Sequence, residues 1–165
     1  MPYPTYPLGL SQLPEAVRLK AQSLGQAGEH WLAMLNPTIT DLAIYWRFTP
    51  GKVLYGGSES LTLAVTLADG AAAVVKLGLP GLCDCQNEAN VLRLANGRGY
   101  VQLLAHSAEH NALLLEGLGV NLARQNLPVQ RQIELICQAL HEAWLPLEHD
   151  HGLLTGRDKA QALPT

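Results

Sequence analysis

A β-hairpin pattern in the middle of the chain sets the strongest constraint on its fold. Residues 61–67 alternate apolar and polar side chains over part of their length, and residues 71–77 are small, β-branched and apolar. The Asp69-Gly70 pair between them is typical of a tight turn, because a type I′ turn needs positive φ at both of its central residues. The sequence therefore predicts two antiparallel strands, and the second strand contains one charged residue, Lys76.

A helix is predicted before the hairpin. Residues 11–36 carry apolar side chains at steps of four and seven, which lie on one face of a helix. Pro14 suits the first turn of this helix, and the Asn36-Pro37 pair is expected to end it. The next segment, residues 41–48, has a mixed period and is compatible with either a short helix or a strand.

A helix and two more strands are predicted after the hairpin. Residues 83–96 have helical spacing with a polar first turn, and Gly97 is placed to terminate the helix. Residues 100–106 and 111–115 are short apolar runs separated by a polar tetrapeptide, which predicts a second hairpin. This order of elements predicts an α+β fold, in which an antiparallel sheet packs against a helix.

The last strong pattern is again helical. Residues 127–144 repeat apolar positions at helical spacing, whereas residues 145–165 have no sustained pattern and are expected to fray. The helix carries an apolar stripe made of Ile133, Ile136, Leu140 and Trp144. A large side chain left in water forfeits about 1.5–3 kcal/mol of burial. If nothing else covers the stripe, self-association through it is therefore expected.

Composition and charge argue against several classes of function. The formal net charge is −3, so the chain has no basic field to hold a nucleic acid or an anionic membrane surface. No apolar run reaches the roughly 18 residues of a membrane helix, and the N-terminus lacks the features of a signal peptide. The cytoplasm is therefore the expected compartment. The three cysteines are an odd number, and two of them are one residue apart, so reduced thiols are expected.

Possible metal-binding patterns fail on their spacing. Cys83 and Cys85 have a single residue between them, whereas structural zinc sites prefer about two to four. His141 begins like the helical H-E-x-x-H motif, but Leu145 stands where the second histidine would be. Residues 149–151 are His, Asp and His, which are types that bind metals, but they form no recognised motif. The sequence therefore predicts no bound metal at these positions.

The hairpin has the parts of a phosphate clamp. Gly56, Gly57, Ser58 and Ser60 come just before the first strand, where a flexible loop can cover phosphate groups. Lys76 lies at the end of the second strand, where an ammonium group can neutralise their charge. On its own a Gly-Gly turn is weak evidence, since glycine marks many turns.

A partner for the lysine is also present. A charge in an apolar strand is costly to bury unpaired, and Glu88 on the following helix is the natural candidate to pair with Lys76. On these residues alone the alternatives stay open. Lys76 is also compatible with a lysine that extends to solvent, and Glu88 with an acid favoured by the start of a helix.

The order and spacing of four segments resemble the N-terminal lobe of the aminoglycoside phosphotransferases. The segments read GGSESLTLAV, ADGAAAVVKLG, NEANVLRLANGRGYVQLL and ALLLEGL. The resemblance is greatest to the aminoglycoside/hydroxyurea resistance kinases, which include streptomycin phosphotransferases, and covers most of residues 8–147. It implies a helical lead-in at residues 1–50, a protein kinase-like N-lobe at 51–115, a hinge at 116–119, and a partial C-lobe helix with a tail at 120–165.

The resemblance also implies roles for single residues. The loop that contains Gly56 to Ser60 would cover the phosphates of ATP, Lys76 would contact the α and β phosphates, and Glu88 would orient the lysine. Glu116 and Leu118 belong to the hinge, whose backbone would meet the adenine. In the intact family the γ-phosphate of ATP passes, with Mg²⁺, to a hydroxyl of a small aminoglycoside-type antibiotic.

One part of the family pattern does not occur in the sequence. Kinases of this family have a catalytic loop of the form H-G-D-x-x-x-x-N, followed by a metal-binding Asp, and residues 148–154 contain His and Asp in a different order. Without the Asp that accepts the hydroxyl proton, we expect little or no phosphoryl transfer from this chain alone. The sequence is therefore interpreted as a truncated kinase of this family. The alternative is a non-catalytic module that binds a nucleotide or a partner protein.

Overall fold

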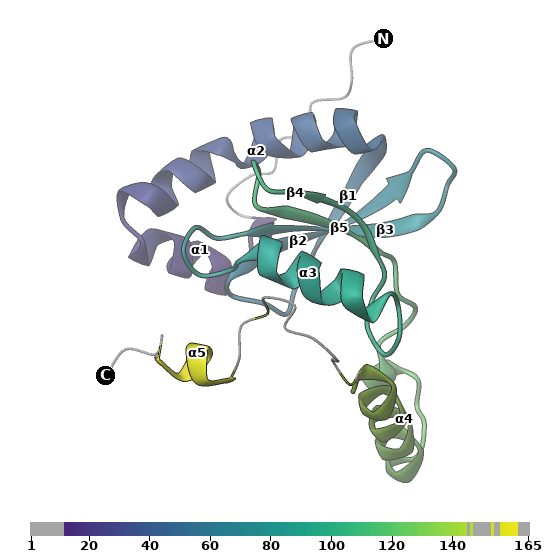
Figure 1. Ribbon diagram of the computed structural model, residues 1–165. Helices are drawn as coiled ribbons and strands as arrows, with labels where there is room; N and C mark the ends of the chain where they lie inside the picture. The colour runs from purple at the N-terminus through teal and green to yellow at the C-terminus, as the bar shows by residue number, and fades with distance from the viewer. Residues whose placement is uncertain (1–11, 145, 147–152, 154–155, 162–165) are drawn as a thin grey trace.

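An antiparallel sheet forms the centre of the computed structural model, which describes residues 12–144, 146, 153 and 156–161 (Figure 1). Within these residues the sheet has five strands in the order β1-β2-β3-β5-β4. The strands are β1 (Phe48–Leu54), β2 (Ser60–Leu67), β3 (Ala72–Gly78), β4 (Leu103–Ser107) and β5 (Ala112–Glu116). The helices are α1 (Glu15–Ser23), α2 (Gln26–Trp46), α3 (Cys85–Ala95), α4 (Val129–Ala143) and α5 (Gly156–Gln161), with a 3₁₀ turn, η2 (Leu122–Arg124). The predicted α+β fold is confirmed.

The two faces of the sheet are covered by different helices, α2 and α3 (Figure 1). The alternation along β3 shows the division, because Ala73 and Val75 are buried under α2 whereas Val74 packs with α3. Strand β5 lies between β3 and β4 and is buried on both faces. This double burial explains why β5 reads as a continuous apolar run instead of an alternating one.

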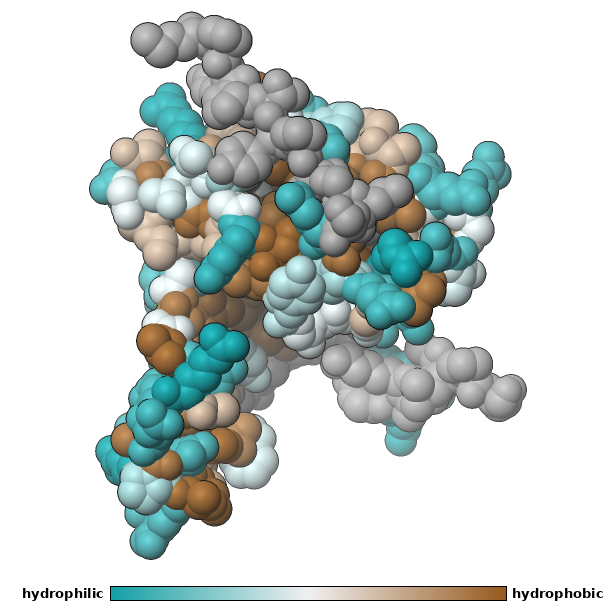
Figure 2. Space-filling model, turned by 180° about the vertical axis from the view of Figure 1, so that it is seen from behind, coloured by the Kyte–Doolittle hydropathy of each residue, from teal (hydrophilic) through white to brown (hydrophobic). Residues whose placement is uncertain are grey.

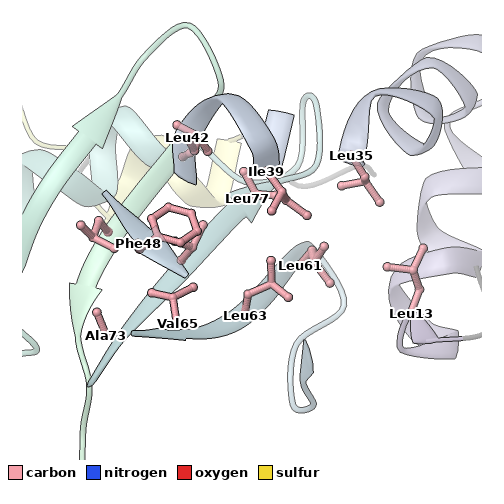
Figure 3. Close-up of a cluster of buried hydrophobic side chains, with 13 residues drawn as sticks. Leu13, Leu35, Ile39, Leu42, Phe48, Leu61, Leu63, Val65, Ala73 and Leu77 are labelled. Carbon is pink, nitrogen blue, oxygen red and sulfur yellow. The ribbon is translucent and has the colours of Figure 1, made fainter. Parts of the chain in front are cut away.

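The larger core lies between α2 and the sheet (Figure 3). Helix α2 contributes one buried stripe to it, and strands β1, β2, β3 and β5 contribute the opposite layer. The buried members are Leu13, Leu35, Ile39, Leu42, Phe48, Leu61, Leu63, Val65, Ala73, Val75, Leu77, Ala112 and Leu114. The smaller cluster under α3 holds the chemistry described below.

The prediction of one helix over residues 11–36, ended by Asn36-Pro37, is wrong. The chain instead forms α1 and α2, which are separated at Gly25, a residue with positive φ (57°), and Pro37 lies inside α2. Proline normally destabilises the interior of a helix, because it lacks the backbone N–H that would donate a hydrogen bond. Here Leu35 and Ile39, on either side of the proline, are buried against the sheet. Their burial offsets the cost of the proline in the helix. The apolar spacing before the proline does not reveal this burial.

The predicted central hairpin is confirmed, since β2 and β3 pair antiparallel along their length. Its turn, however, is not the expected type I′, because Gly70 has positive φ (87°) and Asp69 does not. The N–H of Gly70 donates to the carbonyl of Leu67, and the N–H of Leu67 donates to the carbonyl of Ala71. Residues 68–70 thus form a three-residue loop, in which only the last position needs a left-handed backbone.

The remaining predicted elements are present with shifted ends. Strands β4 and β5 form the second hairpin, and α3 and α4 are the two later helices. Helix α3 is followed by Asn96 in a left-handed conformation (φ 47°), one residue before the predicted terminator Gly97. The undecided segment 41–48 divides between the last turns of α2 and the first residue of β1.

Helix α4 projects away from the sheet (Figure 1) and contains no buried residue. Its stripe is open to solvent, and Ile133, Ile136 and Leu140 are 55%, 49% and 59% exposed. In Figure 2 the projecting part of the molecule carries brown, hydrophobic patches among hydrophilic ones. The helix touches the rest of the fold near Gly99, where an added Cβ would lie 2.7 Å from the carbonyl oxygen of Ala139.

Some sequence predictions fall where no comparison is possible. Leu145, the metal-binding residue types at 149–151 and most of the remaining tail lie outside the described residues. Among the helices that the structure does describe, none combines the length and apolarity needed to cross a membrane.

Candidate functional site

Lys76 lies on the face of β3 that α3 covers. Val74, two residues earlier, packs into the α3 cluster, and Leu113, the partner of Lys76 on β5, is fully buried in it. Strand alternation therefore directs Lys76 toward α3 and away from the larger core. There its Nζ lies 2.5 Å from Oε2 of Glu88, in an ion pair between the strand and the helix.

The ion pair sets the charge of the lysine. Burial by itself would lower the pKa of Lys76, but the hydrogen bond and the negative charge of Glu88, with the nearby Cys83, raise the pKa above its ordinary value. The side chains of Lys76 and Glu88 are 24% and 32% exposed, so water reaches the pair from one side. The structure thus holds a charged ammonium group in a fixed orientation at a partly open position.

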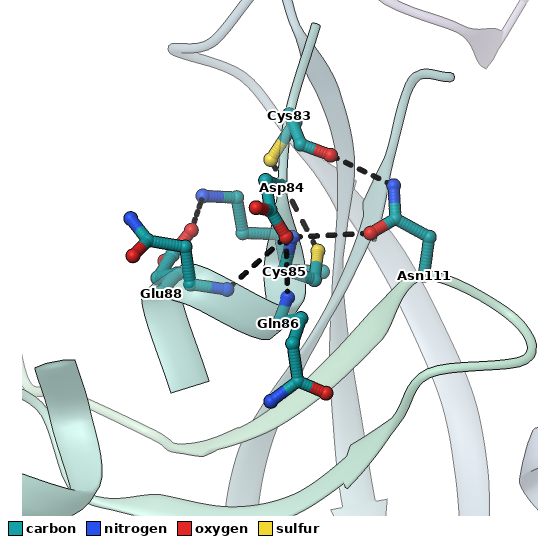
Figure 4. A network of polar contacts seen from close by, with 8 residues as sticks. Cys83, Asp84, Cys85, Gln86, Glu88 and Asn111 are labelled. Atoms are coloured by element: carbon teal, nitrogen blue, oxygen red, sulfur yellow. Dashed lines mark hydrogen bonds and ion pairs between the residues drawn. The ribbon is translucent and has the colours of Figure 1, made fainter. Parts of the chain in front are cut away.

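The start of α3 places Glu88 within reach of the lysine. Asp84 is the N-cap, and its side chain accepts hydrogen bonds from the backbone N–H groups of Gln86 and Asn87 at 3.0 and 3.1 Å (Figure 4). An Asp at this position satisfies donors that a helix start otherwise leaves unpaired. The N–H of Glu88 then donates to the Asp84 carbonyl, which fixes Glu88 in the first turn.

Asn111 fixes the same helix start from the opposite direction (Figure 4). Its Oδ1 accepts the N–H of Cys85 at 3.0 Å, and its Nδ2 donates to the carbonyl of Cys83 at 2.8 Å. This role of Asn111 is not among the sequence predictions. An available signal was its place at the end of a hairpin loop, because Asn tolerates the left-handed backbone (φ 47°) that it adopts there.

Gly78 makes room for this arrangement. Its N–H donates to the carbonyl of Asn111 at 2.9 Å. A Cβ at this position would lie 2.8 Å from the Cys83 carbonyl oxygen and would collide with the Asn111 amide. The end of β3, the turn before β5 and the start of α3 therefore meet at a point where only glycine fits.

The glycine loop between β1 and β2 lies at the same end of the hairpin. Ser60, where the loop ends and β2 begins, pairs with Gly78, two residues beyond Lys76, so the loop lies beside the end of the strand that carries the lysine. Gly56, Gly57 and Ser58 are exposed, and the space around Gly56 is open to at least 4 Å. The structure therefore brings the predicted loop and lysine to one region and leaves the loop room to move.

The predicted hinge begins inside the sheet. Glu116 is the last residue of β5, and its N–H and Oε1 both bind the backbone of Gln102, whereas the N–H of Gly117 donates to the carbonyl of Ala72. Leu118 is the first hinge residue to leave the sheet, and it is 73% exposed.

The residues of this site do not fit a bound Mg²⁺ ion. Magnesium prefers oxygen ligands such as carboxylates. The carboxylate of Glu88, which lies against Lys76, is engaged by the ammonium group. In the described part of the chain no three His, Cys, Asp or Glu side chains come together as a metal site.

Comparison with protein-family models decides the family. Residues 45–164 match the model of the aminoglycoside/hydroxyurea antibiotic resistance kinases. The chain belongs to this family. The predicted family is thereby confirmed, and the sheet with α3 packed on it corresponds to a kinase-like N-lobe.

Two curated relatives of this chain in the aminoglycoside/hydroxyurea kinase family are longer proteins than the chain itself. A streptomycin 6-kinase from Streptomyces glaucescens is 34% identical over 110 residues, which are 66% of this chain and 36% of the relative. A streptomycin 6-kinase from Streptomyces griseus is 31% identical over 102 residues, which are 59% of this chain and 32% of the relative. The matched region thus spans about a third of the length of these relatives.

Proposed function

We propose that this chain is the ATP-binding lobe of an aminoglycoside phosphotransferase. In that reaction the γ-phosphate of ATP passes to a hydroxyl of a small aminoglycoside-type antibiotic. The ion pair between Lys76 and Glu88 carries the proposal, because an oriented, partly exposed ammonium group is what a kinase N-lobe uses to hold nucleotide phosphates. The family match and the names of the relatives support the same reaction class.

Each predicted contact then has a physical role. Lys76 neutralises charge on the α and β phosphates, and Glu88 limits the rotamers that the lysine samples. Gly56, Gly57, Ser58 and Ser60 supply a loop that closes over the phosphates with its backbone N–H groups. The hinge from Glu116 to Leu118 binds the adenine, chiefly through the backbone at the exposed Leu118.

The proposal limits what this chain does by itself. The sequence contains no H-G-D-x-x-x-x-N motif, and the described residues do not fit a Mg²⁺ site. We therefore expect nucleotide binding with little or no phosphoryl transfer from the chain alone. Such a protein would work where ATP is available, and we place it in the cytoplasm.

A second candidate function is a non-catalytic module that binds a partner protein. The observation in its favour is the exposed apolar stripe on α4, since contiguous exposed apolar surface marks many interaction sites. The two candidates differ in whether Lys76 matters for ligand binding.

Thermal unfolding with and without Mg-ATP tests the leading proposal. We expect Mg-ATP to raise the Tm of the wild type, because a ligand that binds the folded state stabilises it. Lys76→Ala should abolish most of this shift. Lys52→Ala, which removes an exposed lysine on β1, should leave it unchanged. Equal shifts in all three proteins, or no shift in any, would overturn the assigned role of Lys76.

A further inference from the structure

The connection from β3 to α3 brings two thiols together beside the lysine. The sulfur atoms of Cys83 and Cys85 face each other at 4.0 Å (Figure 4). Cys83 is partly exposed and Cys85 is fully buried. We propose that they form a peroxide-sensitive pair, in which Cys83 is oxidised first and Cys85 then closes a reversible disulfide.

The surroundings of Cys83 favour its thiolate, which is the reactive form of cysteine. The hydrogen bond from Cys85 lowers the pKa of Cys83 to about 7, and the positive charge of Lys76 acts in the same direction. Burial and the carboxylates of Glu88 and Glu59 oppose this effect without reversing it. Cys85 donates this hydrogen bond to Cys83 and is also buried, and both effects raise the pKa of Cys85. Cys85 therefore keeps its proton while Cys83 reacts.

A small oxidant has access to Cys83. A surface hollow of about 350 Å³ is lined by Gly81, Leu82, Cys83, Asp84 and Asn111. Hydrogen peroxide is little larger than water and fits such a space. Cys85 is fully buried and does not line this hollow, so the oxidant meets Cys83 first.

The reaction with peroxide balances in two steps. The Cys83 thiolate attacks one peroxide oxygen, the O–O bond breaks, and hydroxide leaves, which gives a sulfenic acid. The Cys85 sulfur then attacks the Cys83 sulfur, the S–O bond breaks, and water leaves with the Cys85 proton. Two thiols lose two electrons, and the peroxide is reduced to water, with the hydroxide taking up a proton.

The geometry permits the bond and gives it a structural effect. Residues two positions apart lie at most about 7 Å from each other between Cα atoms, close to the range that a disulfide spans. Bond formation must shorten the 4.0 Å separation to about 2.05 Å. The movement occurs where Asn111 holds Cys83 and Cys85, and one turn before Glu88. Oxidation of the two cysteines therefore shifts the start of α3. The oxidation itself requires no bound nucleotide.

Peptide mapping of the 165-residue chain tests the pair directly. Trypsin leaves both thiols on one peptide, residues 77–93, and the exposed Cys137 on another. After peroxide treatment and alkylation, the first peptide should have lost two hydrogen atoms and resist alkylation until dithiothreitol is added. Cys137 should remain open to alkylation under the same conditions. Equal oxidation of all three cysteines, or a 77–93 peptide that stays fully alkylated, would overturn the proposal.

Two further measurements separate the roles of the thiols. In Cys85→Ala, peroxide should leave Cys83 as a sulfenic acid that a dimedone probe captures, because no resolving thiol is present. In the wild type, the pH profile of Cys83 alkylation should have its midpoint at about pH 7, below the ordinary pKa of a cysteine. Lys76→Met should move this midpoint upward. A Cys83 midpoint at or above the ordinary cysteine value, or no dimedone adduct in Cys85→Ala, would contradict the assignment.

Discussion

Lys76 and Glu88 are twelve positions apart in the chain and belong to different elements, yet their charged groups meet at 2.5 Å. The contact depends on two separate regularities. Alternation on β3 turns the lysine toward α3, and the Asp84 cap sets where the first turn of α3 begins. The ion pair is therefore a sensitive reporter of how strand and helix are placed.

Glu88→Gln removes the negative charge and keeps the shape of the side chain. We expect the free energy of unfolding to fall by about 1–2 kcal/mol, between the values typical of exposed and of buried ion pairs. Denaturant unfolding measures the change. Glu134→Gln is the matched control, because Glu134 pairs with Arg131 on the exposed surface of α4 at 3.0 Å. A loss from Glu134→Gln as large as that from Glu88→Gln would contradict the special role of the pair between Lys76 and Glu88.

The same pair predicts a dependence on alkaline pH. The pKa of Lys76 is higher in the folded chain than its ordinary value of 10.5, so the folded state holds the proton more tightly. The stabilisation is fully present below pH 10.5 and is lost as the pH rises through the folded pKa. The difference in unfolding free energy between wild type and Glu88→Gln should therefore stay constant from about pH 7 to 9 and shrink at higher pH. A difference that grows with pH would have the wrong sign.

Asn111→Gly tests the side chain that binds the start of α3. Glycine accepts the left-handed backbone (φ 47°), but both side-chain hydrogen bonds to Cys83 and Cys85 disappear. We expect a loss of about 1–3 kcal/mol, because two backbone groups lose their partners. Asn126→Gly is the control, since Asn126 has a similar backbone (φ 51°) at an exposed position, and it should change stability by about 0.5 kcal/mol or less.

Gly78→Ala tests the close approach at the end of β3. The added methyl group meets the Cys83 carbonyl and the Asn111 amide, so we expect a loss of about 1–3 kcal/mol. Gly57→Ala is the comparison, because its Cβ would find only ordinary contact, 3.8 Å from Ser60 Oγ. Combined with Asn111→Gly, Gly78→Ala should cost less than the sum of the two changes, since one clash is already relieved. Strict additivity would show that the two residues do not compete for space.

His106 predicts a dependence on acidic pH. Burial and the charge of Arg93 lower the pKa of His106, and its buried Nε2 has no hydrogen-bond partner among the described residues. The unfolded chain therefore takes up a proton more readily than the folded chain, and stability should fall as the pH drops below about 6.5. His106→Leu should flatten the unfolding free energy between about pH 7 and 5 relative to the wild type. Unchanged slopes would show that His106 does not titrate differently in the two states.

The stripe on α4 predicts self-association. Sedimentation velocity over a range of concentrations should show dimers or larger species for the wild type. Ile133→Gln with Ile136→Gln should shift the population to monomer, because the shared surface loses apolar area. Gln138→Ala with Glu142→Ala, on the polar surface of the helix, should leave it unchanged. A wild type that stays monomeric at every concentration would exclude the prediction.

Local patterns predicted the hairpins and α3 well because their signals lie within a few residues. The turn at Asp69-Gly70, the polar first turn of α3 and the apolar run of β5 are features of this kind. The passage of α2 through Pro37 depends instead on the burial of Leu35 and Ile39 against a sheet whose strands come later in the chain. Tertiary packing overrides local preference at such positions, and a single sequence does not display it.

The site shows the same division. Lys76 and Glu88 could be nominated from sequence because a charge in an apolar strand requires a partner. For Asn111 the sequence offers only a turn signal, and for Gly78 none, because their importance lies in the distance between the end of β3, the turn before β5 and the start of α3. For Cys83 and Cys85 the sequence predicts only reduced thiols with the wrong spacing for zinc, since spacing along the chain gives no information about the lysine beside them.

The place of β5 between β3 and β4 has a consequence for how the chain matures. Until residues 112–116 have joined the sheet, β3 presents an unpaired edge with Lys76 on it, and such edges recruit strands from other molecules. Arrival of β5 closes that edge and, through Asn111 just before it, anchors the start of α3. The pairing of β5 with β3 thus both protects the folding chain from aggregation and completes the site around Lys76.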